Sequence, residues 1–199
     1  MNALLVADYH EYKIDEKTLR EAIGGKSVDL IISCGDVPYD TLRKLKERFY
    51  DAPMYAVHGN HCPSAPFPEP IVDLHLNVVK KGTLLISGFE GTLRYKESGN
   101  YLYNDIDVEQ LMGRMPPVDV MISHAPPRGI HDGEDFAHIG FEYFRNYIDE
   151  KKPRFWIHGH SHIKNAVTPI DDTFVVSVYG FKFVRLETAA PEPQTYNLG

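Results

Sequence analysis

Short apolar runs alternate with amphipathic segments along the first half of the chain. Apolar runs at 3–7, 28–33 and 54–57 have the length of buried strands. The segments 15–23 and 42–49, which lie between them, carry apolar residues at helical spacing. Because strands and helices alternate, this half predicts a parallel sheet with right-handed crossovers.

The second half of the chain mixes extended and helical patterns. We expect an extended segment at 78–88, a short helix at 108–112 and a buried strand at 118–123. A helical stripe over 141–148 precedes another strand at 154–157.

The region 166–186 has the pattern of β-strands separated by turns at 171–172 and at Gly180. These late strands are expected to pair antiparallel. Together the segments predict an α/β fold of two mixed β-sheets flanked by helices, built as a single domain over 1–199. The last nine residues, 191–199, predict an irregular tail.

Composition and charge narrow the classes of function. Of 199 residues, 43% are apolar and 25% charged, which is ordinary for a globular domain. The formal net charge of −7 disfavours nucleic acid as a partner, because non-specific binding to nucleic acid relies on a basic surface. No stretch approaches the roughly 20 apolar residues of a membrane helix, so no membrane partner is expected. With Cys34 and Cys62 as the only cysteines, the sequence predicts no disulfide framework and a cytoplasmic location.

Polar side chains gather where the predicted strands end. In open α/β sheets, sites form outside the carboxyl ends of the strands, so these residues are expected to meet at one edge. Any one of them alone would be expected to hydrogen-bond a loop, but five strands that deliver Asp, Asn and His to one edge favour a site. The candidates, in chain order, are Asp8, His10, Asp36, Asn60, His61, His124, His160 and His162.

The chemistry of this set points to metal ions. Carboxylate, amide and imidazole groups suit manganese, iron, zinc or nickel, whereas thiolate-rich sets are typical of structural zinc. In "GHSH", His160 and His162 alternate after a strand and are expected to point the same way. The set offers more ligands than one ion needs, and it predicts two divalent metals about 3.5–4 Å apart that share one carboxylate.

The ordered motifs DxH, GD, GNH, SH and GHSH resemble those of the calcineurin-like metallophosphoesterase superfamily. The resemblance spans residues 8–162, and "SHAPPRGIHDG" followed by "FWIHGHSH" is similar to small stand-alone, phosphodiesterase-type members. It implies a four-layer α/β/β/α sandwich. It also implies a ligand scheme in which Asp8, His10 and His162 hold one metal, Asp36 bridges, and Asn60, His124 and His160 hold the second.

The resemblance implies a metal-dependent phosphoesterase, with phosphodiesters preferred over monoesters. In the family mechanism a hydroxide that bridges the metals attacks phosphorus in line. Manganese is the favoured metal and a phosphorylated small molecule the expected substrate. His61 would stabilise the phosphoryl group or protonate the leaving group, with Asp36 as the bridging catalytic carboxylate and Asn60 beside the substrate. Arg128 could bind a substrate phosphate, although a solvated loop arginine is an equally good interpretation.

Two positions depart from the family pattern. Many relatives have a second Asp in GDxxD that orients the histidine of GNH, and here that position is Tyr39. Many also have Asp or Glu after GNH, and here Cys62 follows. If no carboxylate contacts His61, its action as a general acid weakens, which would favour substrates with good leaving groups.

Two alternatives stay open at this point. A catalytically inactive scaffold of the same fold, like the retromer subunit that resembles the family, would be expected to lose ligands, and this chain keeps all seven. A DNA nuclease of the double-strand-break-repair type is disfavoured by the acidic charge. Exposed strands near the carboxyl end would allow a homo-oligomer.

Several other residues are assigned to packing. Cys34 is expected to be a buried small hydrophobe, and Cys62 is expected to be inert unless metals lower its pKa. The remaining residues fall into three groups: His58 and His158 as packing or orienting residues; His75, His131 and His138 as surface or loop histidines; and Tyr95, Tyr101 and Tyr103 as packing on a strand face, with the rim of a substrate cleft as the alternative.

Overall fold

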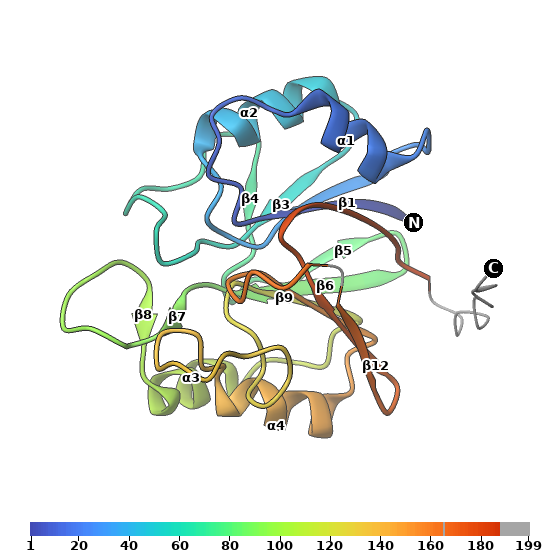
Figure 1. The fold of residues 1–199 in the computed structure, drawn as a ribbon. Helices are drawn as coiled ribbons and strands as arrows, with labels where there is room; N and C mark the ends of the chain where they lie inside the picture. The colour runs from blue at the N-terminus through green and yellow to red at the C-terminus, as the bar shows by residue number, and fades with distance from the viewer. Residues whose placement is uncertain (165, 188–199) are drawn as a thin grey trace, which may run out of the picture.

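Two β-sheets lie face to face between two pairs of helices in the computed structural model of the chain (Figure 1). The structure describes residues 1–164 and 166–187, so the predicted tail at 191–199 lies outside the described residues. The two faces of the molecule are covered by different helix pairs, namely α1 (Glu16–Ile23) with α2 (Tyr39–Arg48), and α3 (Asp105–Met112) with α4 (Glu142–Lys151).

The first sheet has the strand order β13-β1-β2-β3-β4. The central strands run parallel and are joined by helices, as the alternation along the chain predicts. The edge strand β13 pairs antiparallel with β1. The strands are β1 (Asn2–Ala7), β2 (Leu30–Ser33), β3 (Met54–Ala56), β4 (Val72–Asp73) and β13 (Gly180–Arg185).

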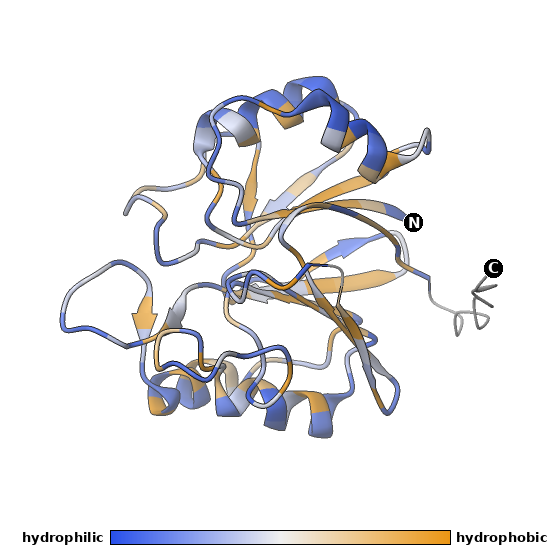
Figure 2. Cartoon of the chain, in the orientation of Figure 1, coloured by the Kyte–Doolittle hydropathy of each residue, from blue (hydrophilic) through white to orange (hydrophobic). Residues whose placement is uncertain are grey.

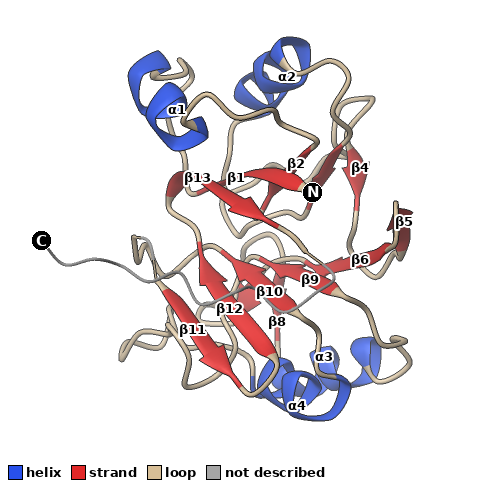
Figure 3. Ribbon diagram, turned by 90° about the vertical axis from the view of Figure 1, so that its right-hand side faces the viewer, coloured by secondary structure: helices blue, strands red, loops and turns tan. Residues whose placement is uncertain are grey.

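The second sheet has the order β11-β12-β10-β9-β6-β5 (Figure 3). Its inner strands are parallel, and both edge strands are antiparallel to their neighbours. The strands are β5 (Val79–Lys81), β6 (Leu84–Phe89), β9 (Val120–Ser123), β10 (Phe155–His158), β11 (Val167–Ile170) and β12 (Thr173–Ser177), and a separate parallel pair is formed by β7 (Thr92–Leu93) and β8 (Leu102–Tyr103).

Alternation of side chains along the strands creates the layers. On β1, Leu5 faces the core between the two sheets, whereas its neighbour Leu4 faces the helices α1 and α2. On β10, Ile157 faces the core between the sheets and Trp156 faces α3 and α4. Both faces of each sheet are therefore apolar, and the helices turn their apolar side towards them (Figure 2). The predicted four-layer α/β/β/α sandwich is confirmed.

Local sequence explains how the first helix begins and ends. Asp15 precedes α1 and accepts hydrogen bonds from the main-chain N–H groups of Lys17 and Thr18. Gly24 ends the helix with φ of 60°, a conformation that glycine adopts without steric cost. No helix within 1–164 and 166–187 is long and apolar enough to cross a membrane.

The structure corrects the predicted pairing of the late strands. β12 pairs antiparallel with β11 as expected, but it pairs parallel with β10. β13 does not continue that sheet; it crosses to the first sheet and pairs with β1. The expected extended segment 78–88 is two strands, β5 and β6, that meet at a turn where Gly82 has φ of 62°. The two-residue strands β4, β7 and β8 were not predicted, because they are too short to create a period.

Candidate metal centre

The loops that follow five strands converge between the facing edges of the two sheets. β1, β2 and β3 of the first sheet lead to Asp8, Asp36 and Asn60, and β9 and β10 of the second lead to His124 and His160. All five side chains are buried. They form the floor of a site whose rim consists of the exposed residues His10, His61 and His162.

Two overlapping groups of these residues have the geometry to share a cation. Asp8, His10 and His162 form one group, and Asp8, Asp36 and His124 form the other. Within each group the ligand atoms lie within 4.8 Å of one another. The structure therefore brings together the carboxylates and most of the imidazoles that the motifs single out.

His124 occupies the centre of the floor. Its Nδ1 lies 2.8 Å from the carbonyl oxygen of Cys34, to which it donates. This bond directs Nε2 at the other ligands, 3.2 Å from Asp36 Oδ2 and 3.0 Å from Asn60 Oδ1. A main-chain carbonyl that accepts from one ring nitrogen and leaves the other for a metal is a common support for histidine ligands.

His160 is supported in the same way through its opposite nitrogen. Its Nε2 lies 2.7 Å from the carbonyl oxygen of Ala137, so the proton on Nε2 is donated there and Nδ1 is left as the ligand atom. The main-chain N–H of His160 donates to Asp8 Oδ2 over 2.7 Å. The ring of His138, which was expected at the surface, stacks on the His160 ring with centroids 4.9 Å apart.

Asp8 carries an unsatisfied oxygen in this floor. Its Oδ1 is buried and accepts no hydrogen bond, and His162 Nε2 is 3.5 Å away. Leaving a buried carboxylate oxygen without a partner is costly unless a cation approaches it. Oxygen and imidazole ligands directed at a buried carboxylate with one oxygen that accepts no hydrogen bond fit the two divalent metals that the motifs imply.

The charges of the floor residues are strongly coupled. Burial by itself would raise the pKa of Asp36, but the charge of His124 and its hydrogen bond outweigh burial and hold that pKa below its usual value. Burial would lower the pKa of His124, yet the charge of Asp36 raises it. Burial, followed by the charge of His124, lowers the pKa of His160 to about 3. His160 is therefore neutral at physiological pH, as a bound metal ligand must be, whereas His124 would release a proton on binding a metal.

The backbone at the site is held in a conformation that non-glycine residues rarely adopt. Asp8, Asp36, His160 and His162 all have φ between 50° and 64°. Such conformations persist where surrounding structure over-determines them, and they cluster at functional sites. Gly59 shows how tight this floor is, because a Cβ at that position would lie 2.2 Å from Asp36 Oδ1.

His61 lies at the rim, beside an open cavity. Its main-chain N–H donates to Asp36 Oδ1 over 2.9 Å, and its ring lies 6.4 Å from that of His10. In the described part of the chain the His61 ring forms no ion pair with a carboxylate, although its charge contributes to lowering the pKa of Asp36. The cavity has a volume of about 570 Å³, and its lining includes His10, Asp36, Tyr39, His61 and Asn100.

The two residues that depart from the family pattern line the same cavity, but their hydrogen bonds go to groups other than the His61 ring. The Tyr39 hydroxyl donates to the carbonyl oxygen of Ala65 over 2.6 Å and lies 3.0 Å from His58 Nε2, so it does not orient His61. Cys62 is buried, and its sulfur accepts from the main-chain N–H of Gly59. Burial raises the pKa of the Cys62 thiol to about 11.

Arg128 has structural partners in this structure. Its Nε donates to the carbonyl oxygen of Gly140 over 2.6 Å, and its guanidinium lies 3.2 Å from Asp105. These contacts tie the loop after β9 to the start of α3. Its role in substrate binding stays a prediction.

Two features near the site escaped the sequence interpretation. Tyr95 OH accepts a 3.1 Å hydrogen bond from Asn60 Nδ2, which fixes the amide so that Oδ1 faces His124. His75, expected on the surface, packs against Glu90 beside His58. Neither is visible in sequence spacing, since the contacts join segments that no motif connects.

Comparison with known proteins gives one family and several structural relatives. The family described as the calcineurin-like phosphoesterase superfamily domain matches residues 1–178, which confirms the predicted resemblance. A lariat debranching enzyme of Arabidopsis thaliana is 28% identical over 73% of this chain and 50% of that protein. The chain thus spans about half the length of this curated relative.

Solved structures support the fold. The structure of the Thermus thermophilus protein TT1561 superposes with a TM-score of 0.58 at 13% identity, covering 90% of this chain and 89% of that one. GAP50, described as the anchor in the inner membrane complex of Plasmodium, gives 0.52 at 14% identity, covering 90% and 71%. At such identities the likeness establishes the fold alone.

Proposed function

This chain belongs to the calcineurin-like phosphoesterase superfamily, and from that premise we propose that it is a metal-dependent hydrolase of phosphodiesters. The observation that carries the proposal is the buried Asp8 Oδ1, which has no hydrogen-bond partner and faces imidazoles from the second sheet. A floor of this kind has no evident role in packing, but it suits cations.

Seven residues would hold two divalent metals in this proposal. When bound, the metals would activate a water molecule as the nucleophile and neutralise charge on the phosphoryl oxygens. Manganese is the metal we favour, and iron, zinc and nickel also suit this ligand set. In the family's scheme the first ion would take Asp8, His10, Asp36 and His162, and the second would take Asp36, Asn60, His124 and His160. Two sets in the structure lie close enough to share a cation, Asp8 with His10 and His162, and Asp8 with Asp36 and His124.

The residues of the chain prepare the site for phosphoryl transfer. Carbonyl groups of Cys34 and Ala137 fix the rings of His124 and His160, so that the ligands need no rearrangement. At the rim, His61 is positioned by its bond to Asp36 and can donate a hydrogen bond to a phosphoryl oxygen or a leaving group.

The lining of the rim cavity favours diesters over monoesters. The described residues that line it include histidines, tyrosines and Asp40, but neither lysine nor arginine. Beyond the proposed metals, the described lining offers no cation for the second negative charge of a monoester dianion, whereas a diester carries a single charge. A volume of about 570 Å³ also leaves room for a second ester group.

A hydrolysis screen in the presence of Mn²⁺ tests the proposal. We expect a higher kcat/KM for bis(p-nitrophenyl) phosphate than for p-nitrophenyl phosphate, and we expect EDTA to abolish both activities. Asp36→Asn should lower kcat/KM by at least about a hundredfold, since the bridging carboxylate is lost. Asp172→Asn, the same change at an exposed turn, should leave it unchanged.

The outcomes also separate the rival functions. Absence of metal-dependent turnover across diesters, monoesters and anhydrides would contradict the enzyme and favour a scaffold of the same fold. A salt-sensitive shift of duplex DNA in a gel would instead favour a nuclease, which the net charge of −7 disfavours.

A further inference from the structure

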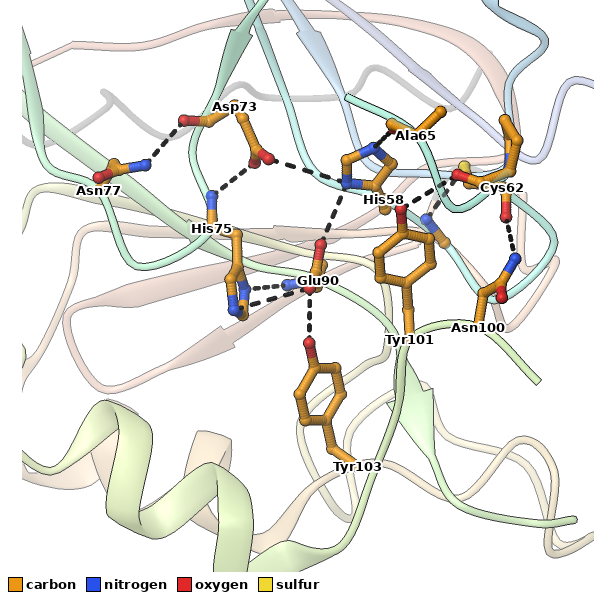
Figure 4. Close-up of polar contacts among 12 residues, drawn as sticks. His58, Cys62, Ala65, Asp73, His75, Asn77, Glu90, Asn100, Tyr101 and Tyr103 are labelled. Atoms are coloured by element: carbon orange, nitrogen blue, oxygen red, sulfur yellow. Dashed lines mark hydrogen bonds and ion pairs between the residues drawn. The ribbon is translucent and has the colours of Figure 1, made fainter. Parts of the chain in front are cut away.

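A second polar cluster lies behind the loop that carries Asn60 and His61. His58, at the end of the segment that follows β3, faces Asp73 of β4 and Glu90, which directly follows β6 (Figure 4). His58 Nδ1 is 3.1 Å from Glu90 Oε2 and 3.9 Å from Asp73 Oδ2. The three ligand atoms lie within 4.8 Å of one another.

Hydrogen bonding fixes which nitrogen of His58 carries a proton. The single hydroxyl proton of Tyr39 is donated to the carbonyl oxygen of Ala65. The Tyr39 oxygen, 3.0 Å from His58 Nε2, must therefore accept, and the Ala65 oxygen, 3.2 Å from Nε2, can only accept. Nε2 is thus the protonated nitrogen of His58.

This tautomer leaves a conflict at the other nitrogen. In a neutral His58, the lone pair of Nδ1 faces the two carboxylates of Asp73 and Glu90, which is repulsive. A cation at this point would contact all three groups, whose ligand atoms lie within 4.8 Å of one another. The His58 and Glu90 side chains are buried, at 4% and 10% exposed, while Asp73 is 42% exposed.

The surroundings of Glu90 aim one of its oxygens at this point. Tyr103 OH donates to Glu90 Oε1 over 2.5 Å. The main-chain N–H of Glu90 donates to His75 Nδ1, so a neutral His75 carries its proton on Nε2. That nitrogen lies 3.7 Å from Glu90 Oε1. His75 is therefore a donor and not a ligand. With Oε1 satisfied, Oε2 is left for His58 and its cation.

The geometry favours a metal ion at this point, because two carboxylate oxygens and the free nitrogen of one imidazole converge on it. We propose that His58 Nδ1, Asp73 and Glu90 form a third divalent-cation site, of the zinc class, separate from the proposed hydrolytic centre.

The distances and exposure suit this assignment. Zinc ligands at about 2.0–2.2 Å in a tetrahedron lie roughly 3.3 Å apart, and the observed separations of 3.1 and 3.9 Å bracket that value. The Asp73 side chain is 42% exposed, which gives an ion access and leaves room for water as the fourth ligand. The ion would join the first sheet to the end of β6. Tyr39, which stands where many relatives have Asp, sets the tautomer of His58.

Zinc stoichiometry tests the site without reference to activity. Wild type, Asp73→Asn, Asp36→Asn and the double variant are dialysed to equilibrium against Zn²⁺, and bound metal is measured by mass spectrometry. We expect Asp73→Asn to bind one equivalent less than wild type, and the double variant one less than Asp36→Asn. Asp172→Asn is the matched control and should lose none. If the proposed hydrolytic centre binds no zinc, only the difference between Asp36→Asn and wild type disappears. The loss caused by Asp73→Asn is still expected.

Equal zinc binding with and without Asp73 would overturn the proposal. A second measurement keeps the test valid if Asp73→Asn fails to fold: ¹⁵N NMR of the wild-type His58 ring. We expect zinc to replace a proton on Nδ1 and to shift that resonance. An Nδ1 that stays protonated at saturating zinc would identify His58 as an imidazolium and exclude the metal.

Discussion

The two buried histidines of the candidate centre each donate one ring proton to a main-chain carbonyl, but through opposite nitrogens. His124 uses Nδ1 towards Cys34, and His160 uses Nε2 towards Ala137. His124 thereby presents Nε2 to Asp36, and His160 is left with Nδ1 unprotonated. The choice depends on which carbonyl lies behind the ring, so it cannot be deduced from the spacing of histidines in the sequence.

Because the His61 ring forms no ion pair with a carboxylate within the described residues, we can predict how the proposed hydrolysis depends on the leaving group. A strong general acid contributes about 10²–10⁴-fold, mainly to poor leaving groups. We expect His61→Ala to lower kcat/KM for aryl and alkyl diesters by a similar factor, below about tenfold. Pre-steady-state and steady-state rates across a series of leaving groups measure this. A hundredfold loss confined to alkyl esters would show that His61 is an effective acid.

Both thiols should resist modification in the folded protein. Cys34 is fully buried and Cys62 is 4% exposed. Burial raises the pKa of Cys62 to about 11, so at pH 8 the thiol keeps its proton and lacks nucleophilic character. Ellman's reagent at pH 8 should titrate two thiols in guanidinium and none rapidly in the native state. Fast reaction of one native thiol would mean that the loop after Asn60 opens.

At the scale of elements, strand periodicity was the reliable signal in the sequence. The runs that became β1, β2, β9 and β10 are apolar on both faces, and they were predicted within two residues of their observed bounds. Of the side chains that the motifs single out, Asp8, His10, Asp36, His124 and His162 fall into groups that could share a cation. What could not be predicted is long-range pairing: β13 joins β1 from the far end of the described chain, and nothing local specifies that choice over β12.

Helix α4 packs on the outer face of the second sheet through a cluster of aromatic side chains. The Phe144 ring lies 5.5 Å from that of Phe89 and 4.9 Å from those of Phe141 and Trp156. Phe144→Ala should cost about 3–5 kcal/mol of unfolding free energy, because it removes a fully buried ring. Calorimetry should show a Tm lower by about 6–20 °C.

The matched control for this change is Phe136→Ala. The Phe136 side chain is 59% exposed, so its removal should alter stability by less than about 0.5 kcal/mol. Equal destabilisation by the two variants would mean that α4 is held by contacts other than the aromatic cluster.

At the scale of the whole molecule, the candidate centre joins the two sheets. Asp8, Asp36 and Asn60 belong to loops of the first sheet, and His124 and His160 to loops of the second. Carboxylates and imidazoles contact one another across this junction, and Asp8 Oδ1 accepts no hydrogen bond. Cations bound by ligands from the loops of both sheets would therefore link the two sheets, which otherwise contact each other through their apolar faces.

This arrangement predicts that metal binding stabilises the fold. A ligand at a hundredfold excess over its Kd adds about 2.7 kcal/mol to the free energy of unfolding. For a chain of this length, that corresponds to a rise in Tm of about 5–11 °C. Calorimetry with Mn²⁺ and then EDTA should show the rise and its reversal. Asp36→Asn should lose most of the rise, since that carboxylate would serve both ions, while Asp172→Asn should keep it. An equal rise in Tm in Asp36→Asn and wild type would mean that the stabilising metal binds elsewhere. The two sheets would then be held together by the apolar core alone.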